Sequence, residues 1–198
     1  MSYLNKLSEC IVTFFYIGKL KYCPGTFGSL AAFPLCYLIS YYSSFLNWQL
    51  PIGSAAISRQ LIIVFAVNIM CSVFLFIVGT FFSSIYARHK MQDDPKEVVI
   101  DEVVGQMLTV ALSFPAVLFV ITSEIPRFIS TGVIFFIFLF FLPFILFRFC
   151  DIIKPWPINW LDKNIKGGIG IMVDDILAAI FAAILHYAIA FTLIGWFG

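Results

Sequence analysis

Charged residues are scarce in this sequence. Only 12% of its 198 residues are Asp, Glu, Lys or Arg, a share well below that of an ordinary soluble domain. The net charge is +1, so nothing favours electrostatic capture of nucleic acid. These shortages argue against an ordinary soluble fold and against a nucleic-acid partner.

Paired cysteines and clustered histidines are also missing. The five cysteines are odd in number and widely spaced, with no C-x-x-C pair, and the only histidines are His89 and His186. This pattern predicts neither a disulfide framework nor a zinc site.

Long apolar runs make up most of the chain instead. Hydrophobic residues account for 62% of it, with 24 phenylalanines and a mean hydropathy of +1.01. No stretch alternates with the period of a strand, and a backbone in lipid must satisfy its own hydrogen bonds, which favours helices. We therefore expect one domain over residues 1–198, an all-α integral membrane helical bundle with about four or five spans. The candidate spans are residues 30–46, 61–86, 103–121, 128–147 and 176–196.

The basic residues predict the orientation of these spans. With five spans, ten of the twelve basic residues fall on one side of the membrane, and only Arg59 and Arg127 fall on the other. The positive-inside rule then places the ten at the cytoplasmic face.

Two polar segments, residues 93–102 and 151–175, hold nine of the eleven acidic residues. The topology brings both segments to the cytoplasmic face. We therefore expect a polar catalytic cluster there.

Each polar segment contains an adjacent acidic pair next to an apolar run, and we expect both pairs at helix starts. They are Asp101-Glu102 and Asp174-Asp175. Neighbouring residues on a helix point about 100° apart. One carboxylate of each pair can therefore face a shared site while the other meets a different partner.

The residues before the first pair have a helical spacing. Asp94, Glu97 and Asp101 lie at i, i+3 and i+7, which predicts one shared helical face. The Asp-Pro dipeptide at 94–95 is typical of a turn, and we expect Lys96 and Glu97 to open the helix that follows.

Buried carboxylates need compensating cations. An ionised side chain deep in a membrane helix costs about 2.5–3.5 kcal/mol, so the four paired acids would together cost roughly 10 kcal/mol. Arg148, Lys154 and Lys163 can supply part of the positive charge. A divalent ion can supply the rest, and Mg²⁺ suits a site made only of oxygen ligands.

A plainer interpretation is that these acids are solvated charges in loops. It stays equally open for Asp93, Lys96, Glu97 and Lys166. It is disfavoured for the two acidic pairs, because they adjoin apolar helices.

Two glycine-containing turns, residues 24–29 and 167–170, can present backbone N–H groups to an anion at a helix N-terminus. Neither matches the G-x-x-x-x-G-K-[ST] phosphate loop. Helix capping and close helix packing explain the glycines almost as well.

Three blocks together resemble the phosphatidylglycerophosphatase A family of bacterial membrane lipid phosphatases. They are PGTFGSLAA (24–32), DDPKEVVIDEVVGQMLT (93–109) and FRFCDIIKPWPINWLDKNIKGGIGIMVDD (147–175). They occur in the order typical of the family and cover more than a quarter of the chain. Two positions depart from it: Lys163 stands where Arg is frequent, and Ala179 where Gly is common.

The resemblance implies a phosphoric monoester hydrolase of phospholipid biosynthesis, located in the bacterial cytoplasmic (inner) membrane. Its substrate would be phosphatidylglycerophosphate, its products phosphatidylglycerol and phosphate, and its cofactor Mg²⁺. Membrane lipids are the only other partners expected, with no obligate protein partner.

The site residues that we expect fall into three groups by role. The residues that would bind the metal and activate the attacking group are Asp101, Glu102, Asp174 and Asp175. The residues that would bind the phosphate are Arg148, Lys154, Thr26, Ser29, Gly167 and Gly168. Asp151 would orient Lys154 or bind metal, and direct attack by water and a phospho-aspartate intermediate are both compatible with this set.

Motifs of rival families do not occur. The chain lacks the D-G-x-x-A-R of CDP-alcohol phosphotransferases, the P-S-G-H of type 2 phosphatidic acid phosphatases and the D-x-D of haloacid-dehalogenase-type phosphatases. An ion-coupled transporter would need paired broken spans and a site near the midplane. A non-catalytic membrane subunit would leave the clustered acids unexplained.

Overall fold

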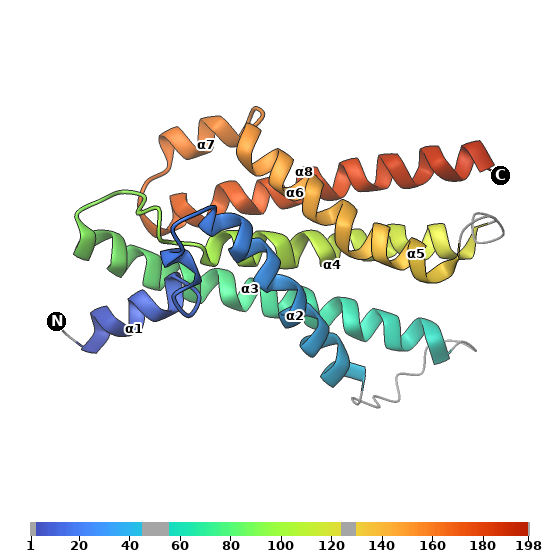
Figure 1. The fold of residues 1–198 in the computed structure, drawn as a ribbon, viewed down its shortest axis with the longest axis horizontal. Helices are drawn as coiled ribbons and strands as arrows, with labels where there is room; N and C mark the ends of the chain where they lie inside the picture. Colours follow the sequence, from blue (N-terminus) through green and yellow to red (C-terminus); the bar gives the residue numbers. More distant parts are fainter. Residues whose placement is uncertain (1–2, 45–55, 124–129, 198) are drawn as a thin grey trace.

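The computed structural model describes residues 3–44, 56–123 and 130–197, and these residues contain helices and no strand. Figure 1 shows the elements arranged along one long axis. In chain order they are α1 (Tyr3–Val12), η1 (Ile17–Lys19), α2 (Pro24–Ser44), α3 (Ala56–Lys90), α4 (Ile100–Thr122), α5 (Thr131–Phe135), η3 (Phe136–Phe141), α6 (Leu142–Ile153), α7 (Ile158–Asn164) and α8 (Gly167–Phe197).

Four stretches in the described part of the chain are long and apolar enough to cross a membrane. They are residues 62–90, 100–121, 132–153 and 167–196. They correspond to four of the five predicted spans, and the remaining one, 30–46, begins within α2. The prediction of an all-α membrane bundle is confirmed.

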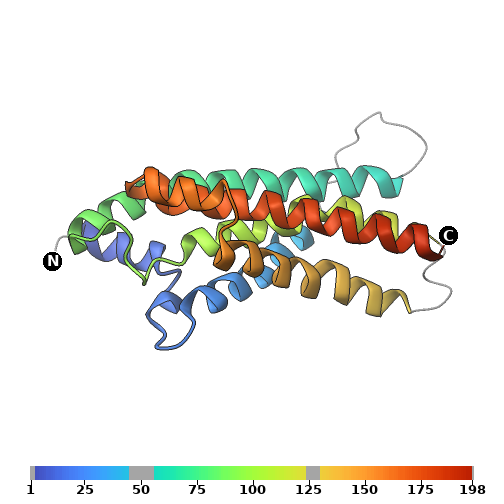
Figure 2. The same cartoon turned by 90° about the horizontal axis from the view of Figure 1, so that it is seen from above.

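Helix α4 is the centre of the bundle. It packs against α2, α3, α6 and α8, as the two views in Figures 1 and 2 also show. Gly105 allows the closest approach: a Cβ there would lie 2.6 Å from the Phe147 ring and 3.1 Å from the Asp175 carbonyl oxygen. Small residues permit such contacts between membrane helices, and this one brings α4, α6 and α8 together beside the acidic pairs.

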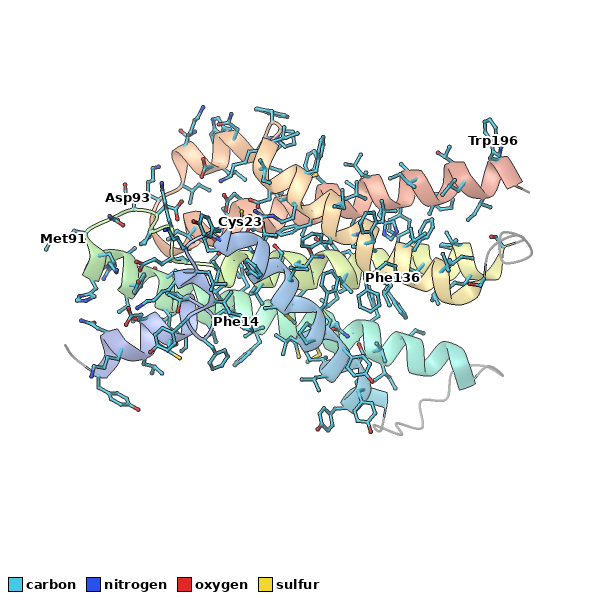
Figure 3. All side chains as sticks on the ribbon, viewed as in Figure 1. Phe14, Cys23, Met91, Asp93, Phe136 and Trp196 are labelled. Atoms are coloured by element: carbon cyan, nitrogen blue, oxygen red, sulfur yellow. The ribbon has the colours of Figure 1, made fainter. Side chains whose placement is uncertain are left out.

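Both polar segments lie at the same end of the bundle, as the charge distribution predicted. The end of α3, the start of α4, α7 and the start of α8 meet there (Figures 1 and 2). Figure 3 shows Met91 and Asp93 at this end and Trp196 at the opposite end. We call it the polar end.

The prediction of a helical face formed by Asp94, Glu97 and Asp101 is wrong. Helix α4 begins only at Ile100, and the residues before it form turns. The backbone before α4 is hydrogen-bonded to α1 instead: the Val99 N–H donates to the Val12 carbonyl oxygen at 2.9 Å. This hydrogen bond holds the segment at the end of α1. Lys96 and Glu97 therefore do not open α4.

Helices α6 and α8 extend further towards the polar end than predicted. Helix α8 begins at Gly167, so Asp174 and Asp175 lie about two turns inside it rather than at its start. Gly168 permits this start because it packs closely: a Cβ there would lie 2.1 Å from the Thr80 carbonyl oxygen of α3. Helix α6 continues to Ile153 and places Arg148 and Asp151 one turn apart.

The span made of α5, η3 and α6 is irregular near Pro143, as expected. Residues Phe136–Phe141 form a π-helix, and α6 begins directly after it with Pro143 in its first turn. The short helix α7 was not predicted, because its seven residues contain no clear apolar period.

Candidate active site

Three carboxylates from two helices converge at the polar end. Asp101 and Glu102 open α4, and Asp175 lies on α8. Each offers an oxygen that lies within 4.8 Å of those of the other two. We call these residues the carboxylate trio.

Asp175 is buried, Asp101 and Glu102 are half-buried, and the trio is incompletely hydrogen-bonded. Asp175 is 3% exposed. Asp101 Oδ1, Glu102 Oε2 and Asp175 Oδ2 are buried and have no hydrogen-bond partner within the described ranges. Three such carboxylates repel one another and lose hydration, so a cation is needed to stabilise their ionised forms.

A divalent cation with oxygen ligands fits this donor set. The trio provides carboxylate oxygens only, without a histidine or cysteine. Mg²⁺ prefers one or a few carboxylates together with water and phosphate oxygens, whereas zinc sites favour nitrogen and sulfur. The residues that can hold such an ion are therefore Asp101, Glu102 and Asp175.

Arg148 lies beside the trio and links three helices. Its Nη1 is 2.7 Å from Asp151 Oδ2 on α6, 4.0 Å from Glu102 Oε1 on α4 and 3.5 Å from Ser29 Oγ on α2. Its Nε is buried without a hydrogen-bond partner among the described residues. Arg148 thus provides a fixed positive charge with unused donor capacity.

Lys154 belongs to a second ionic group. Its Nζ is 2.5 Å from Asp174 Oδ2 and 3.0 Å from Asp162 Oδ1. Burial alone would lower the pKa of Lys154, but the hydrogen bonds and negative charges of Asp174 and Asp162 outweigh it and raise that pKa above its usual value. The lysine is therefore held in its charged form.

The two acidic pairs behave differently. Asp174 and Asp175 diverge, one towards Lys154 and one into the trio, as the angle between helix neighbours predicted. Asp101 and Glu102 both join the trio. Asp151 contacts Arg148, not Lys154 as one of the two predicted roles required.

The predicted phosphate-binding residues separate in the structure. Ser29 contacts Arg148, whereas Thr26 is half-buried on the same turn. The Gly168 N–H donates to Ser84 Oγ of α3 at 3.2 Å, and Gly168 packs against that helix. These contacts give the phosphate role of Gly167 and Gly168 no support, and it stays a prediction.

Gly25 is a residue of the site that the sequence analysis did not single out. A Cβ at this position would lie 2.1 Å from Glu102 Oε1 and 3.3 Å from Arg148 Nη1. The first turn of α2 can therefore approach the trio only with a glycine here. The P-G-T-F-G-S turn was the available signal, but its spacing did not show which glycine makes the contact.

Glu97 lies in another environment. It accepts a hydrogen bond from the Tyr86 hydroxyl, and Lys90 Nζ lies 2.9 Å from its Oε2. These contacts lower the pKa of Glu97, with the Tyr86 hydrogen bond as the largest cause. Glu97 is thus a structural acid outside the trio.

Comparison with known proteins identifies the family of this chain. The sequence profile of the family Phosphatidylglycerophosphatase A matches residues 10–190. The chain is 31% identical to phosphatidylglycerophosphatase A of Escherichia coli K12 over 166 residues, which is 84% of this chain and 73% of that protein. It is 54% identical to the protein of the same name from Haemophilus influenzae Rd over 48 residues, 24% of this chain and 29% of that one.

A further relative carries a different name. The chain is 32% identical over 111 residues to a Bacteroides thetaiotaomicron protein named provisionally as a phosphatidylinositol-3-phosphatase, covering 52% of this chain and 57% of that protein. No solved structure matches the chain. The profile match and the extent of the Escherichia coli match show that the chain belongs to the phosphatidylglycerophosphatase A family.

Proposed function

We propose that this protein hydrolyses phosphatidylglycerophosphate to phosphatidylglycerol and phosphate in phospholipid biosynthesis, with Mg²⁺ as its cofactor. The observation that carries the proposal is the buried carboxylate trio with Arg148 beside it at the polar end. Family membership supports the choice of a lipid phosphomonoester. A polar site at one end of a membrane bundle suits a substrate whose head group is charged and whose tails are apolar.

In this proposal the acidic residues of the site bind the metal, and the basic residues contact the phosphate. Asp101, Glu102 and Asp175 would hold the metal, which when bound supplies positive charge to the phosphoryl oxygens. Arg148 neutralises further charge that develops during transfer, and its unpaired Nε is free to donate to a phosphoryl oxygen. Asp151 orients Arg148 through its 2.7 Å ion pair.

Asp174 has a different role in this proposal from the one the sequence suggested. Its contact with Lys154 makes it the residue that positions that lysine rather than a fourth metal ligand. Lys154, held also by Asp162, provides a second cation for the head group.

The polar end faces the cytoplasm in this proposal, and the membrane is the bacterial inner membrane. The basic residues concentrated at that end support the orientation. The acyl chains of the substrate stay among the apolar helices while its phosphate reaches the trio.

The decisive assay is phosphate release by purified protein in lipid vesicles containing phosphatidylglycerophosphate. We expect release with Mg²⁺ and none after chelation with EDTA, with recovery when Mg²⁺ is restored. Vesicles with phosphatidylinositol 3-phosphate provide the comparison substrate, since one relative carries that name. No release from phosphatidylglycerophosphate, or preferential release from the inositol lipid, would contradict the proposal.

Gly25→Ala is expected to lower the rate of phosphate release. The new methyl group would lie 2.1 Å from Glu102 Oε1 and must displace that carboxylate. A displacement of about 1 Å at a catalytic group can cost about 10²-fold in rate, and we expect a loss approaching that size. Gly195→Ala is the matched control, because a Cβ there meets nothing within 4 Å. Equal activity of the two variants would show that α2 does not constrain the trio.

A further inference from the structure

Gln106 on α4 is a fully buried side chain that the proposed mechanism does not use. It has no exposed surface, and neither its Oε1 nor its Nε2 has a hydrogen-bond partner within the described parts of the chain. Lipid cannot satisfy such an amide, and most buried amides are paired. Gln106 differs from other unpaired buried groups because it lies one turn from Glu102 of the trio, where a bound molecule can complete its hydrogen bonds.

The neighbours of Gln106 show which way it faces. Val103 and Met107 pack in one cluster with residues of α2 and α3. Gly105 is approached by the Phe147 ring of α6. With about 100° between successive residues, Gln106 lies between these two directions. It therefore faces the interface between α2 and α6.

Glu102 occupies the same interface one turn nearer the polar end. Its Oε1 is 4.0 Å from Arg148 Nη1 of α6, and Gly25 of α2 packs directly against it. The i, i+4 spacing places Gln106 on the same face, about 6 Å further along the helix. Glu102 Oε2, Arg148 Nε and both amide atoms of Gln106 are thus unpaired polar atoms along one interface.

The hydrogen-bonding capacity of these atoms indicates which molecule can bind to them. The amide Oε1 needs a hydrogen-bond donor, which a phosphomonoester dianion does not provide. A water molecule can donate one hydrogen to Gln106 Oε1 and the other to Glu102 Oε2, and its lone pairs then stay free to attack. Glutamine amides orient attacking water in this way in other phosphoryl-transfer sites.

We propose that Gln106 and Glu102 together hold and orient the water molecule that attacks the phosphorus, which makes Gln106 a further catalytic residue. The inference rests on the proposed function. As the water oxygen bonds to phosphorus, the ester bond between phosphorus and the glycerol oxygen breaks. The water gives up one proton as it attacks and the departing oxygen takes one up, so the products are an alcohol and phosphate.

The test compares Gln106→Leu with Ser113→Ala. Leucine keeps much of the volume and removes both polar atoms. Ser113 is a matched control because it lies on the same face of α4, two turns deeper, and is also fully buried with an unpaired hydroxyl. Neither side chain has a hydrogen-bond partner among the described residues, so neither substitution breaks a hydrogen bond within them, and both variants should melt close to the wild type.

We expect Gln106→Leu to lower kcat by about 10²-fold, because the water loses its orientation. KM, the inhibition constant of inorganic phosphate and the Mg²⁺ midpoint should not change, since none of them depends on the attacking water. Ser113→Ala should have wild-type kinetics. Gln106→Met is measured in parallel, so that a packing defect of one variant does not decide the result.

Three outcomes would overturn the inference. Wild-type kcat in both Gln106 variants would show that the amide has no role. A parallel shift in the phosphate constant or in the Mg²⁺ midpoint would make Gln106 a phosphate or metal contact instead. An equal loss in Ser113→Ala would indicate a general effect of α4 packing. A wild-type protein that releases no phosphate from phosphatidylglycerophosphate would instead contradict the proposed function.

Discussion

Asp175→Asn is expected to abolish nearly all phosphate release while the protein still inserts in the membrane. Asp175 is 3% exposed, and its Oδ2 is unpaired beside Asp101 and Glu102. The amide keeps the shape of the side chain but removes its charge, so metal binding and transfer should both weaken. We expect a loss of about 10²–10⁴-fold, as large as that for removal of a general acid or base, and a similar loss for Asp101→Asn.

Stability provides an independent readout of the same change. Without a divalent cation, the trio carries like charges that repel one another in a buried site. Asp175→Asn should therefore melt at a higher temperature than the wild type in EDTA. Mg²⁺ should raise the melting temperature of the wild type, because a ligand stabilises the state that binds it, and should have much less effect on the variant.

Asp93→Asn is the matched control for this prediction. Asp93 is an exposed carboxylate at the same end of the bundle, outside the trio. It should keep wild-type activity and a wild-type response to Mg²⁺. Near-normal activity in both Asp101→Asn and Asp175→Asn would remove the trio from the mechanism.

Arg148→Met is expected to cause the second-largest loss. Arg148 contacts Asp151, Glu102 and Ser29 from three different helices. The substitution removes a preorganised cation from the transferring phosphoryl group, and losing one such group costs about 10²–10³-fold in kcat. It also leaves two carboxylates without their cation, so the variant should be less stable than the wild type.

Arg148→Lys separates the charge of this residue from its shape. Lysine keeps the positive charge but lacks the planar fork of donors, including the Nε–H that is unpaired in Arg148. We expect activity between that of the wild type and that of Arg148→Met. Arg88→Met is the control, because Arg88 is an exposed arginine at the same polar end. Equal kcat for Arg148→Met and Arg88→Met would refute the role of Arg148.

Much of the site followed from the order of residues along the chain. The acidic pairs, Arg148 and Lys154 were all identified from their position beside apolar spans, and the structure brings them into two ionic groups at the polar end. The assignment of roles was less complete. Asp151 was expected near Lys154, but the one-turn spacing on α6 places it on Arg148 instead.

Helix boundaries were the weakest part of the prediction. Asp94 and Glu97 have a helical spacing, yet the backbone before Ile100 pairs with the end of α1. The glycines at 167–170 were interpreted either as an anion-binding turn or as capping and packing residues, and in the structure they open α8, with Gly168 packed against α3. Before Ile100, a tertiary contact overrode the local helical pattern.

The sequence by itself determined that the chain forms membrane helices and that both polar segments lie at one end. Hydropathy and charge act residue by residue against the bilayer, so no knowledge of packing was needed. Only the tertiary structure decided that Asp175 joins the trio while Asp174 holds Lys154, and that Gly25 lies against Glu102. The rotation of each helix about its axis determines which of its side chains face the site. Contacts such as that of Gly105 with Phe147 determine this rotation. Such contacts join residues far apart in the chain, and a single sequence does not reveal them.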